Sequence, residues 1–114
     1  MVSICFYFQI HQPIRLRRYS VFEIGQHNNY FDEEKNESII KKVMHKCYLP
    51  TNKIIFDLIG KTDGKFKVSY SMTGIVLEQL EKYAPEVIDS FKQLVSTGCV
   101  EILDETYYHT LSYL

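Results

Sequence analysis

The sequence predicts an α/β fold whose parallel strands form the first three βα units of an incomplete, TIM-like barrel. Three short runs with strand character alternate with segments whose apolar residues recur at helical spacing, in the order β-α-α-β-α-α-β. Strands separated by helices pair in parallel through right-handed crossovers, and the helices then cover the sheet. A complete barrel takes about 250 residues, so we expect residues 1–114 to be part of one truncated barrel domain. A complete domain with a small open sheet is the alternative, although it would leave the third strand as a bare edge.

The first strand is expected within residues 2–10 (VSICFYFQI), a nearly continuous run of apolar and β-favouring residues. Such runs are typical of strands that are covered on both faces. Pro13 then ends regular strand pairing. Residues 14–36 are polar and irregular, and we expect the basic cluster at 15–18 and the acidic cluster at 32–34 to be solvated.

Two helices are expected between the first and second strands. Asn36 or Ser38 could cap the first helix, because short polar side chains bond to the free N–H groups of a first helical turn. Pro50 suits the first turn of the second helix, where the missing N–H of proline costs nothing. Apolar residues at helical spacing mark the two buried faces: Ile39, Ile40, Val43, Met44 and Cys47, then Ile54, Ile55, Leu58 and Ile59.

The second half of the chain repeats this pattern. Residues 66–72 alternate between apolar and polar side chains with the period of a strand. Thr73 and Gly74 break that strand and open a helix, and a further helix starts at Pro85 and ends before Gly98. Residues 99–103 (CVEIL) form the third expected strand.

Composition and cysteine usage indicate a cytoplasmic globular protein. The chain is 46% hydrophobic and 24% charged with a formal net charge of -1, so it lacks the basic excess of nucleic-acid-binding proteins. No apolar run approaches the length of a membrane span, and no basic segment precedes the first apolar run as in a signal peptide. Cys5, Cys47 and Cys99 are odd in number and have apolar neighbours, which predicts buried thiols in a reducing compartment.

Polar residues at the ends of the expected strands are the candidates for chemistry. Ligands of parallel α/β folds gather at the carboxyl ends of the strands. His11 and Gln12 directly follow the first strand, Glu101 lies within the third, and Glu105 and His109 follow it. A buried carboxylate needs a partner, so we expect Glu101 to face the same cavity as His11.

Structural roles compete with this interpretation. A histidine after a strand is more often a satisfied structural group than a catalytic one. A glutamate in a short strand can equally face water. Tyr107 and Tyr108 can stack on sugar rings but more often serve packing. The residues alone predict a polar pocket and no particular reaction or ligand.

Several segments resemble glycoside hydrolase family 57, which comprises α-amylases, amylopullulanases, 4-α-glucanotransferases and α-glucan branching enzymes. Residues 4–13, which end in His-Gln-Pro after the first strand, resemble the opening motif of that family. Residues 98–109 (GCVEILDETYYH) resemble the second motif of its α-amylase-like members. Residues 46–50 (KCYLP) and 73–87 also look like that subgroup, so the resemblance covers essentially the whole chain.

The resemblance implies a (β/α)7 barrel and a retaining mechanism on α-1,4-linked glucans or maltooligosaccharides. Its nucleophile and acid/base belong to later motifs, so we expect no catalytic residue within 1–114, and no hydrolysis by this N-terminal fragment alone. The matching motifs imply substrate binding by His11, Gln12 and Glu101, and His109 lies beside the second motif. No cofactor, metal, nucleic acid or membrane is implied. The resemblance leaves open whether the full-length enzyme hydrolyses, transfers or branches.

Two other classes of function stay open at this stage. The first is a metal-dependent carbohydrate-active barrel, such as a polysaccharide deacetylase or an α-mannosidase-like enzyme, with His11 and His109 as ligands. Against it, Gln12 and Pro13 follow His11, where an HxD or HxH pair would be expected. The second is a non-catalytic module that binds α-glucan or another protein.

Overall fold

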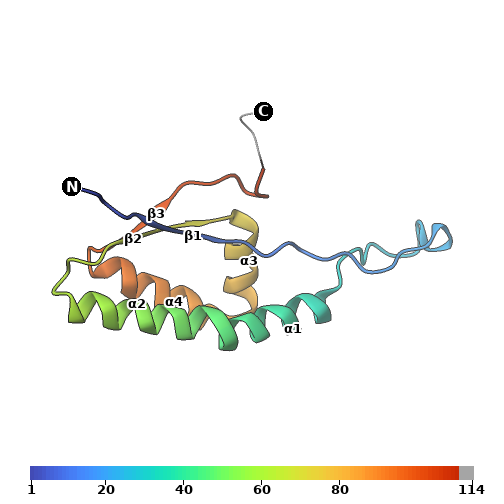
Figure 1. Ribbon diagram of the computed structural model, residues 1–114. Coiled ribbons are helices and arrows are strands. Elements are labelled where there is room, and N and C mark those ends of the chain that lie inside the picture. The colour runs from blue at the N-terminus through green and yellow to red at the C-terminus, as the bar shows by residue number, and fades with distance from the viewer. Residues whose placement is uncertain (111–114) are drawn as a thin grey trace.

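A three-stranded parallel sheet with helices packed on one of its faces forms the body of the protein (Figure 1). The computed structural model describes residues 1–110. Its strands are β1 (Phe6–Ile10), β2 (Val68–Met72) and β3 (Val100–Leu103), in the order β1-β2-β3 across the sheet. Both pairs are parallel. The predicted α/β class and the order of strands and helices are therefore confirmed.

The two helices expected before β2 form one continuous rod. A π turn (Met44–Tyr48) joins α1 (Glu33–Val43) to α2 (Leu49–Lys61) without a break. Pro50 explains the turn, because proline has no N–H for the carbonyl four residues earlier and its ring crowds that carbonyl. A wider turn ahead of Pro50 lets the helix continue.

The start of α1 differs from the sequence prediction. Neither Asn36 nor Ser38 caps the helix; Asp32 does, with its Oδ1 accepting a hydrogen bond of 3.0 Å from the backbone N–H of Lys35. The acidic cluster at 32–34 is therefore a cap and a first helical turn, where negative charge interacts favourably with the helix dipole.

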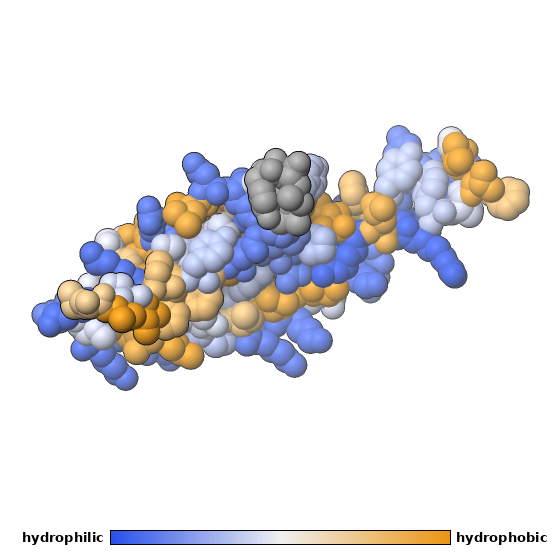
Figure 2. All heavy atoms as spheres, turned by 45° about the horizontal axis from the view of Figure 1, so that its top comes forward, coloured by the Kyte–Doolittle hydropathy of each residue, from blue (hydrophilic) through white to orange (hydrophobic). Residues whose placement is uncertain are grey.

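Asn36 instead anchors the long segment before α1. Its buried side chain accepts a hydrogen bond from the backbone N–H of Arg15 (2.9 Å) and donates to the carbonyl of Arg15 (3.3 Å). Beyond this anchor, an antiparallel bridge between Leu16 and Phe31 closes an arm that projects from the body (Figure 1). The short 3-10 helix of the arm (Val21–Glu23) lies near its apolar, exposed end (Figure 2).

The helices between β2 and β3 begin and end where the sequence predicts. Thr73 caps α3 (Gly74–Tyr83), with its Oγ1 accepting from the N–H of Val76 at 3.3 Å. The next helix, α4 (Pro85–Ser96), ends before Gly98, which has a φ of +75°. Glycine adopts this left-handed conformation without the steric cost of a Cβ.

The two faces of the sheet differ in polarity. Alternate strand residues face the helices and form the core with α1–α4, among them Val68, Tyr70 and Val100. The residues between them form the other face, which we call the open face: Tyr7, Gln9, Ser69, Ser71, Glu101 and Leu103. The segment after β3 runs over this open face (Figure 1).

The prediction that β1 is covered on both faces is wrong for the described residues. Phe6, Tyr7 and Phe8 are exposed, because β1 is an edge strand and helices lie on only one side of the sheet. The expectation of buried thiols also fails for two of three cysteines. Cys5 and Cys47 are exposed, and Cys99 is half-buried beside the carbonyl of Gly64.

Two leucines of α3 provide a test of the core. Leu80 is fully buried, whereas Leu77 on the same helix is 40% exposed. We expect Leu80→Ala to lower the free energy of unfolding by about 2–5 kcal/mol, because it leaves a cavity. Leu77→Ala, which removes the same atoms from a half-solvated position, should cost well under half of that. Chemical denaturation followed by circular dichroism measures both, and equal losses would contradict this account of the core.

Candidate functional site

Side chains from all three strand ends meet at one edge of the sheet. Parallel strands end at the same edge, so the residues that follow them are neighbours in space. His11 follows β1 and Thr73 follows β2. Glu105 and His109 follow β3, and Gln9 joins them from within β1. We call these five residues the carboxyl-edge cluster.

His11 is held by the residue that starts α3. Its Nδ1 lies 2.8 Å from Oγ1 of Thr73, whose side chain is completely buried. The hydroxyl accepts from the N–H of Val76 and keeps its own proton for the imidazole. When the hydroxyl donates to Nδ1, the imidazole proton is on Nε2, which then serves as a hydrogen-bond donor.

Gln9, Glu105 and His109 form a three-way contact beside His11. Nδ1 of His109 lies 2.6 Å from Oε1 of Glu105 and 2.6 Å from Nε2 of Gln9, and Gln9 also donates to Glu105. The rings of His109 and His11 lie 5.1 Å apart between centroids, tilted by 34°. Residues 9 and 109 are therefore joined directly although 99 residues separate them in sequence.

Glu105 is the charged member of the cluster. Burial raises the pKa of its carboxyl, but the hydrogen bonds from His109 and Gln9 outweigh burial, so the pKa lies below that of a free glutamate. Its second oxygen, Oε2, is buried and has no hydrogen-bond partner among the described protein groups. The cluster thus holds an ionised carboxylate with one acceptor oxygen unused.

The segment after β3 is fastened to α3, which fixes the position of His109. The carbonyl of Tyr107 accepts from the N–H of Ile75 (3.1 Å), and the phenol of Tyr107 donates to the carboxylate of Glu78. That bond raises the pKa of Tyr107 to about 12. His109 itself has a φ of 58°, a conformation that non-glycine residues adopt at a cost.

Two of the four predicted binding residues come together. His11 and His109 are adjacent, as described above. Gln12 is turned toward the arm, because its side-chain oxygen accepts from Nη2 of Arg15 (3.1 Å) and its carbonyl accepts from Gln79 (2.6 Å). The basic residue Arg15 therefore has a structural partner.

The sequence predicts that Glu101 and His11 face one cavity, but the pairing of the strands places the two residues at different levels of the sheet. Glu101 is level with Ser69 of β2, and Ser69 is level with Tyr7 of β1. His11 lies four residues further along, which is about 13 Å at the rise of a strand. The carboxylate beside His109 is instead that of Glu105, from the loop after β3. Substrate binding by Glu101 stays a prediction.

Sequence reasoning missed Gln9, Thr73 and the central position of Glu105. Gln9 had a usable signal, since residues two apart in a strand share a face and Gln9 therefore accompanies His11. The open face continues from the cluster as a polar surface, with the phenol of Tyr7 2.6 Å from the hydroxyl of Ser71. Amide, hydroxyl and carboxylate groups next to two imidazoles can donate to and accept from a hydroxyl-rich ligand.

Within residues 1–110, no group of three or more His, Cys, Asp or Glu side chains is arranged to hold a metal ion. The described helices are also too short or too polar to cross a membrane.

Comparison with known proteins identifies relatives. The family model described as "Glycosyl hydrolase family 57" matches residues 5–114. A Methanocaldococcus jannaschii protein named "Putative alpha-amylase" is 45% identical over 116 residues, which cover 97% of this chain and 24% of that protein. A Pyrococcus horikoshii "Alpha-amylase" is 31% identical over 75 residues, or 66% of this chain and 11% of that protein. The chain thus spans about a quarter of its more similar relative, and no solved structure matches it significantly.

The charge of Glu105 can be tested by titration. We expect its carboxyl carbon signal in NMR spectra to titrate below the range of a free glutamate. Gln9→Ala should raise that midpoint, because a hydrogen bond to the ionised form is lost. Gln93→Ala, at an exposed position of α4, is the matched control and should leave it unchanged. A pKa lower in the folded than in the unfolded state stabilises the fold at neutral pH, and that contribution is lost as pH falls through the folded value.

Gly74 tests how His109 is positioned. A Cβ at Gly74 would overlap the ring of Tyr107. Gly74→Ala should therefore displace the ring and separate His109 from His11, although alanine favours the helix. Nuclear Overhauser contacts between the two imidazoles measure the effect, with Gly60→Ala as control, since nothing lies near Gly60. Unchanged contacts in Gly74→Ala would contradict the positioning role of Tyr107.

Proposed function

This chain belongs to glycosyl hydrolase family 57, and on that premise we propose that its carboxyl-edge cluster binds sugar hydroxyls in the active site of a retaining α-glucan hydrolase or glucanotransferase. The observation that carries the proposal is the direct contact of His11 with His109, which joins the two segments that resemble motifs of the family. The names of the two relatives support an α-glucan as substrate. The full-length protein is then an enzyme of carbohydrate metabolism.

The proposed role of the cluster is to hold and orient the sugar. His11 offers an imidazole N–H when Thr73 bonds its other nitrogen, and Glu105 supplies an acceptor carboxylate that Gln9 and His109 hold in place. A donor beside an acceptor matches a sugar hydroxyl, which does both. Holding the ring in one orientation lowers the barrier of the later chemical step, because the orientational entropy is lost on binding.

Glu101 and Gln12 are proposed as weaker contributors to binding. Because Glu101 lies about 13 Å along the open face from His11, it would contact a different sugar unit of a longer glucan. Gln12 supports the proposal less, since its side chain already bonds to Arg15. An oligosaccharide laid along the open face would pass the exposed Gln9 between these two levels.

Bond cleavage is proposed to need residues that this chain lacks. A retaining glycosidase uses a nucleophile and an acid/base whose carboxyl groups lie about 5 Å apart. The family resemblance assigns both to motifs after the second. The chain by itself should therefore bind maltooligosaccharides without releasing reducing ends.

We also propose a cytoplasmic location. Cys5 and Cys47 have exposed thiols, and Cys99 is free as well. Exposed thiols persist where glutathione keeps them reduced, whereas secreted proteins of this size tend to pair their cysteines.

Binding can be tested by NMR with maltoheptaose. We expect the amide and imidazole signals of His11 and His109 to shift on titration, and His11→Ala to weaken binding about three- to tenfold, as for one or two lost hydrogen bonds. His45→Ala, at an exposed position of the π turn, is the matched control. Equal affinity of wild type and His11→Ala would contradict the proposal. Release of reducing sugar by the chain would contradict the proposal that the nucleophile and the acid/base lie outside it. A full-length protein that binds maltoheptaose without cleaving it would instead be a glucan-binding module.

A further inference from the structure

A small cavity lies between α1, α3 and the base of the arm (Figure 1). Phe31 lines it from the arm, Glu33 from α1, and Gln79 and Tyr83 from α3. We call it the arm-base cavity. Its volume is about 190 Å³, and it shares no residue with the carboxyl-edge cluster. Drug-sized ligands occupy about 300–1,000 Å³, so this cavity suits a smaller molecule, of the size of one sugar ring.

Gln79 gives the cavity a buried acceptor without a partner. Its side chain is only 3% exposed, and its Nε2 donates to the carbonyls of Gln12 (2.6 Å) and Ile75 (3.4 Å). Both amide hydrogens are therefore used, and the two carbonyls fix which end of the amide is the oxygen. That oxygen, Oε1, is buried and has no donor among the described residues. An unpaired buried acceptor is costly, so a ligand that donates a hydrogen bond here stabilises the fold.

The ionised groups that line the cavity already have partners. Nζ of Lys82 lies 3.1 Å from Oε1 of Glu33 and 5.1 Å from the centroid of the Tyr83 ring. Glu78 accepts a hydrogen bond from the phenol of Tyr107. A charged ligand beside the neutral amide oxygen would find these groups engaged, and a buried charge without its own partner is costly. A neutral hydroxyl avoids that cost, so the cavity favours an uncharged ligand.

Aromatic and polar groups share the cavity as a sugar ring requires. Phe31 and Tyr83 supply aromatic surface and Ile14 aliphatic surface, against which the C–H groups of a pyranose can pack. The exposed side chains of Lys82 and Glu78 can donate to and accept from its outer hydroxyls. A water molecule would satisfy the amide oxygen alone, whereas a sugar also covers the apolar walls.

Two residues of the cavity are bonded to the segments that carry the cluster. Gln79 donates to the carbonyl of Gln12, which follows His11 in sequence. Glu78 holds the phenol of Tyr107, two residues before the second histidine of the cluster. A ligand that contacts both side chains therefore acts on each histidine segment through one hydrogen bond.

We propose that the arm-base cavity binds one neutral pyranose ring, and that its occupancy changes the geometry of the carboxyl-edge cluster. The ring is either a free monosaccharide or the end unit of a glucan. This second site is separate from the cluster, so the inference goes beyond the proposed function and does not depend on it.

Titration of the chain with D-glucose tests the proposal. We expect saturable shifts of the side-chain amide signal of Gln79 and of the backbone signals around it, at concentrations up to about 100 mM, which reveal a Kd in the millimolar range. The imidazole signals of His11 and His109 should shift with the same midpoint. Glycerol, which has hydroxyls but no ring, is the control probe and should give no saturable shift.

Two variants locate the site. Phe31→Ala removes an aromatic wall that is 52% exposed and outside the core, so the fold should persist while glucose binds about fivefold more weakly. Phe22→Ala, at an 84% exposed position of the same arm away from the cavity, is its matched control. Gln79→Met removes the free acceptor and should weaken binding about three- to tenfold, with Gln93→Met on the exposed side of α4 as control.

The outcomes separate this site from the cluster. Glucose should bind His11→Ala with the affinity of wild type, and shifts that vanish in His11→Ala overturn the proposal. So does the absence of saturable shifts around Gln79, which would leave the cavity to water only, or an unchanged affinity in Phe31→Ala. Histidine signals that stay in place when glucose is bound overturn the coupling to the cluster.

The same signals distinguish the two sources of the ring. Maltoheptaose that shifts the Gln79 signals at lower concentration than glucose identifies the end of a glucan as the ligand. Tighter binding of glucose identifies a free monosaccharide.

Discussion

The parallel register of β2 with both of its neighbours is the constraint on which the core and the site depend. It directs Val68 and Tyr70 toward the helices, while Ser69 and Ser71 face the opposite side. A slip by one residue in either pair would exchange these sets, burying hydroxyls among apolar side chains. The alternation along β2 therefore specifies one register, and that register brings the ends of β1 and β3 to the same edge as the end of β2.

Thr73 links the formation of α3 to the geometry of the site. One hydroxyl accepts from the first turn of the helix and bonds to His11, so the helix cannot start elsewhere without releasing the imidazole. The same helix holds the segment after β3 through Ile75 and Tyr107. The carboxyl-edge cluster is thus supported by regular secondary structure on two sides, which limits the motion of its side chains.

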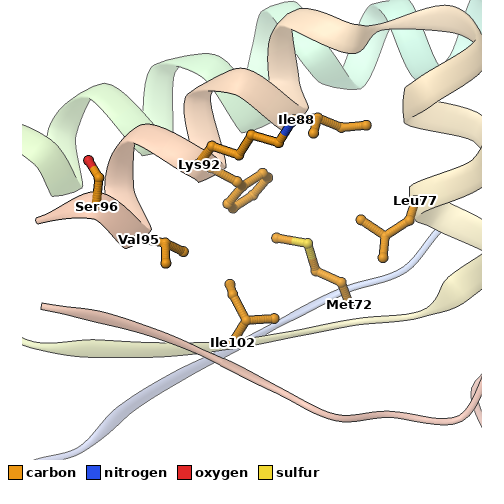
Figure 3. A pocket seen from close by; sticks show the side chains of 8 residues that line it. Met72, Leu77, Ile88, Lys92, Val95, Ser96 and Ile102 are labelled. Atoms are coloured by element: carbon orange, nitrogen blue, oxygen red, sulfur yellow. The ribbon is translucent and has the colours of Figure 1, made fainter. Parts of the chain in front are cut away.

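The two sides of the sheet have opposite chemistry. Polar residues such as Gln9 and Ser71 belong to the open face that leads to the cluster, whereas Leu77 and Ile102 line an apolar groove on the helix-covered side (Figure 3).

The sequence alone determined the strand and helix order, the parallel pairing, and the placement of His11 and His109 near the site, because periodicity and strand ends are local properties. It also carried the family resemblance that the comparisons confirmed. Only the tertiary structure decided that Glu105, and not Glu101, contacts Gln9 and His109 beside His11. That choice rests on the register between strands, which places Glu101 level with Tyr7, and on the path of the loop after β3. The structure also decided that Asp32 caps α1 and that α1 continues into α2 through a π turn ahead of Pro50.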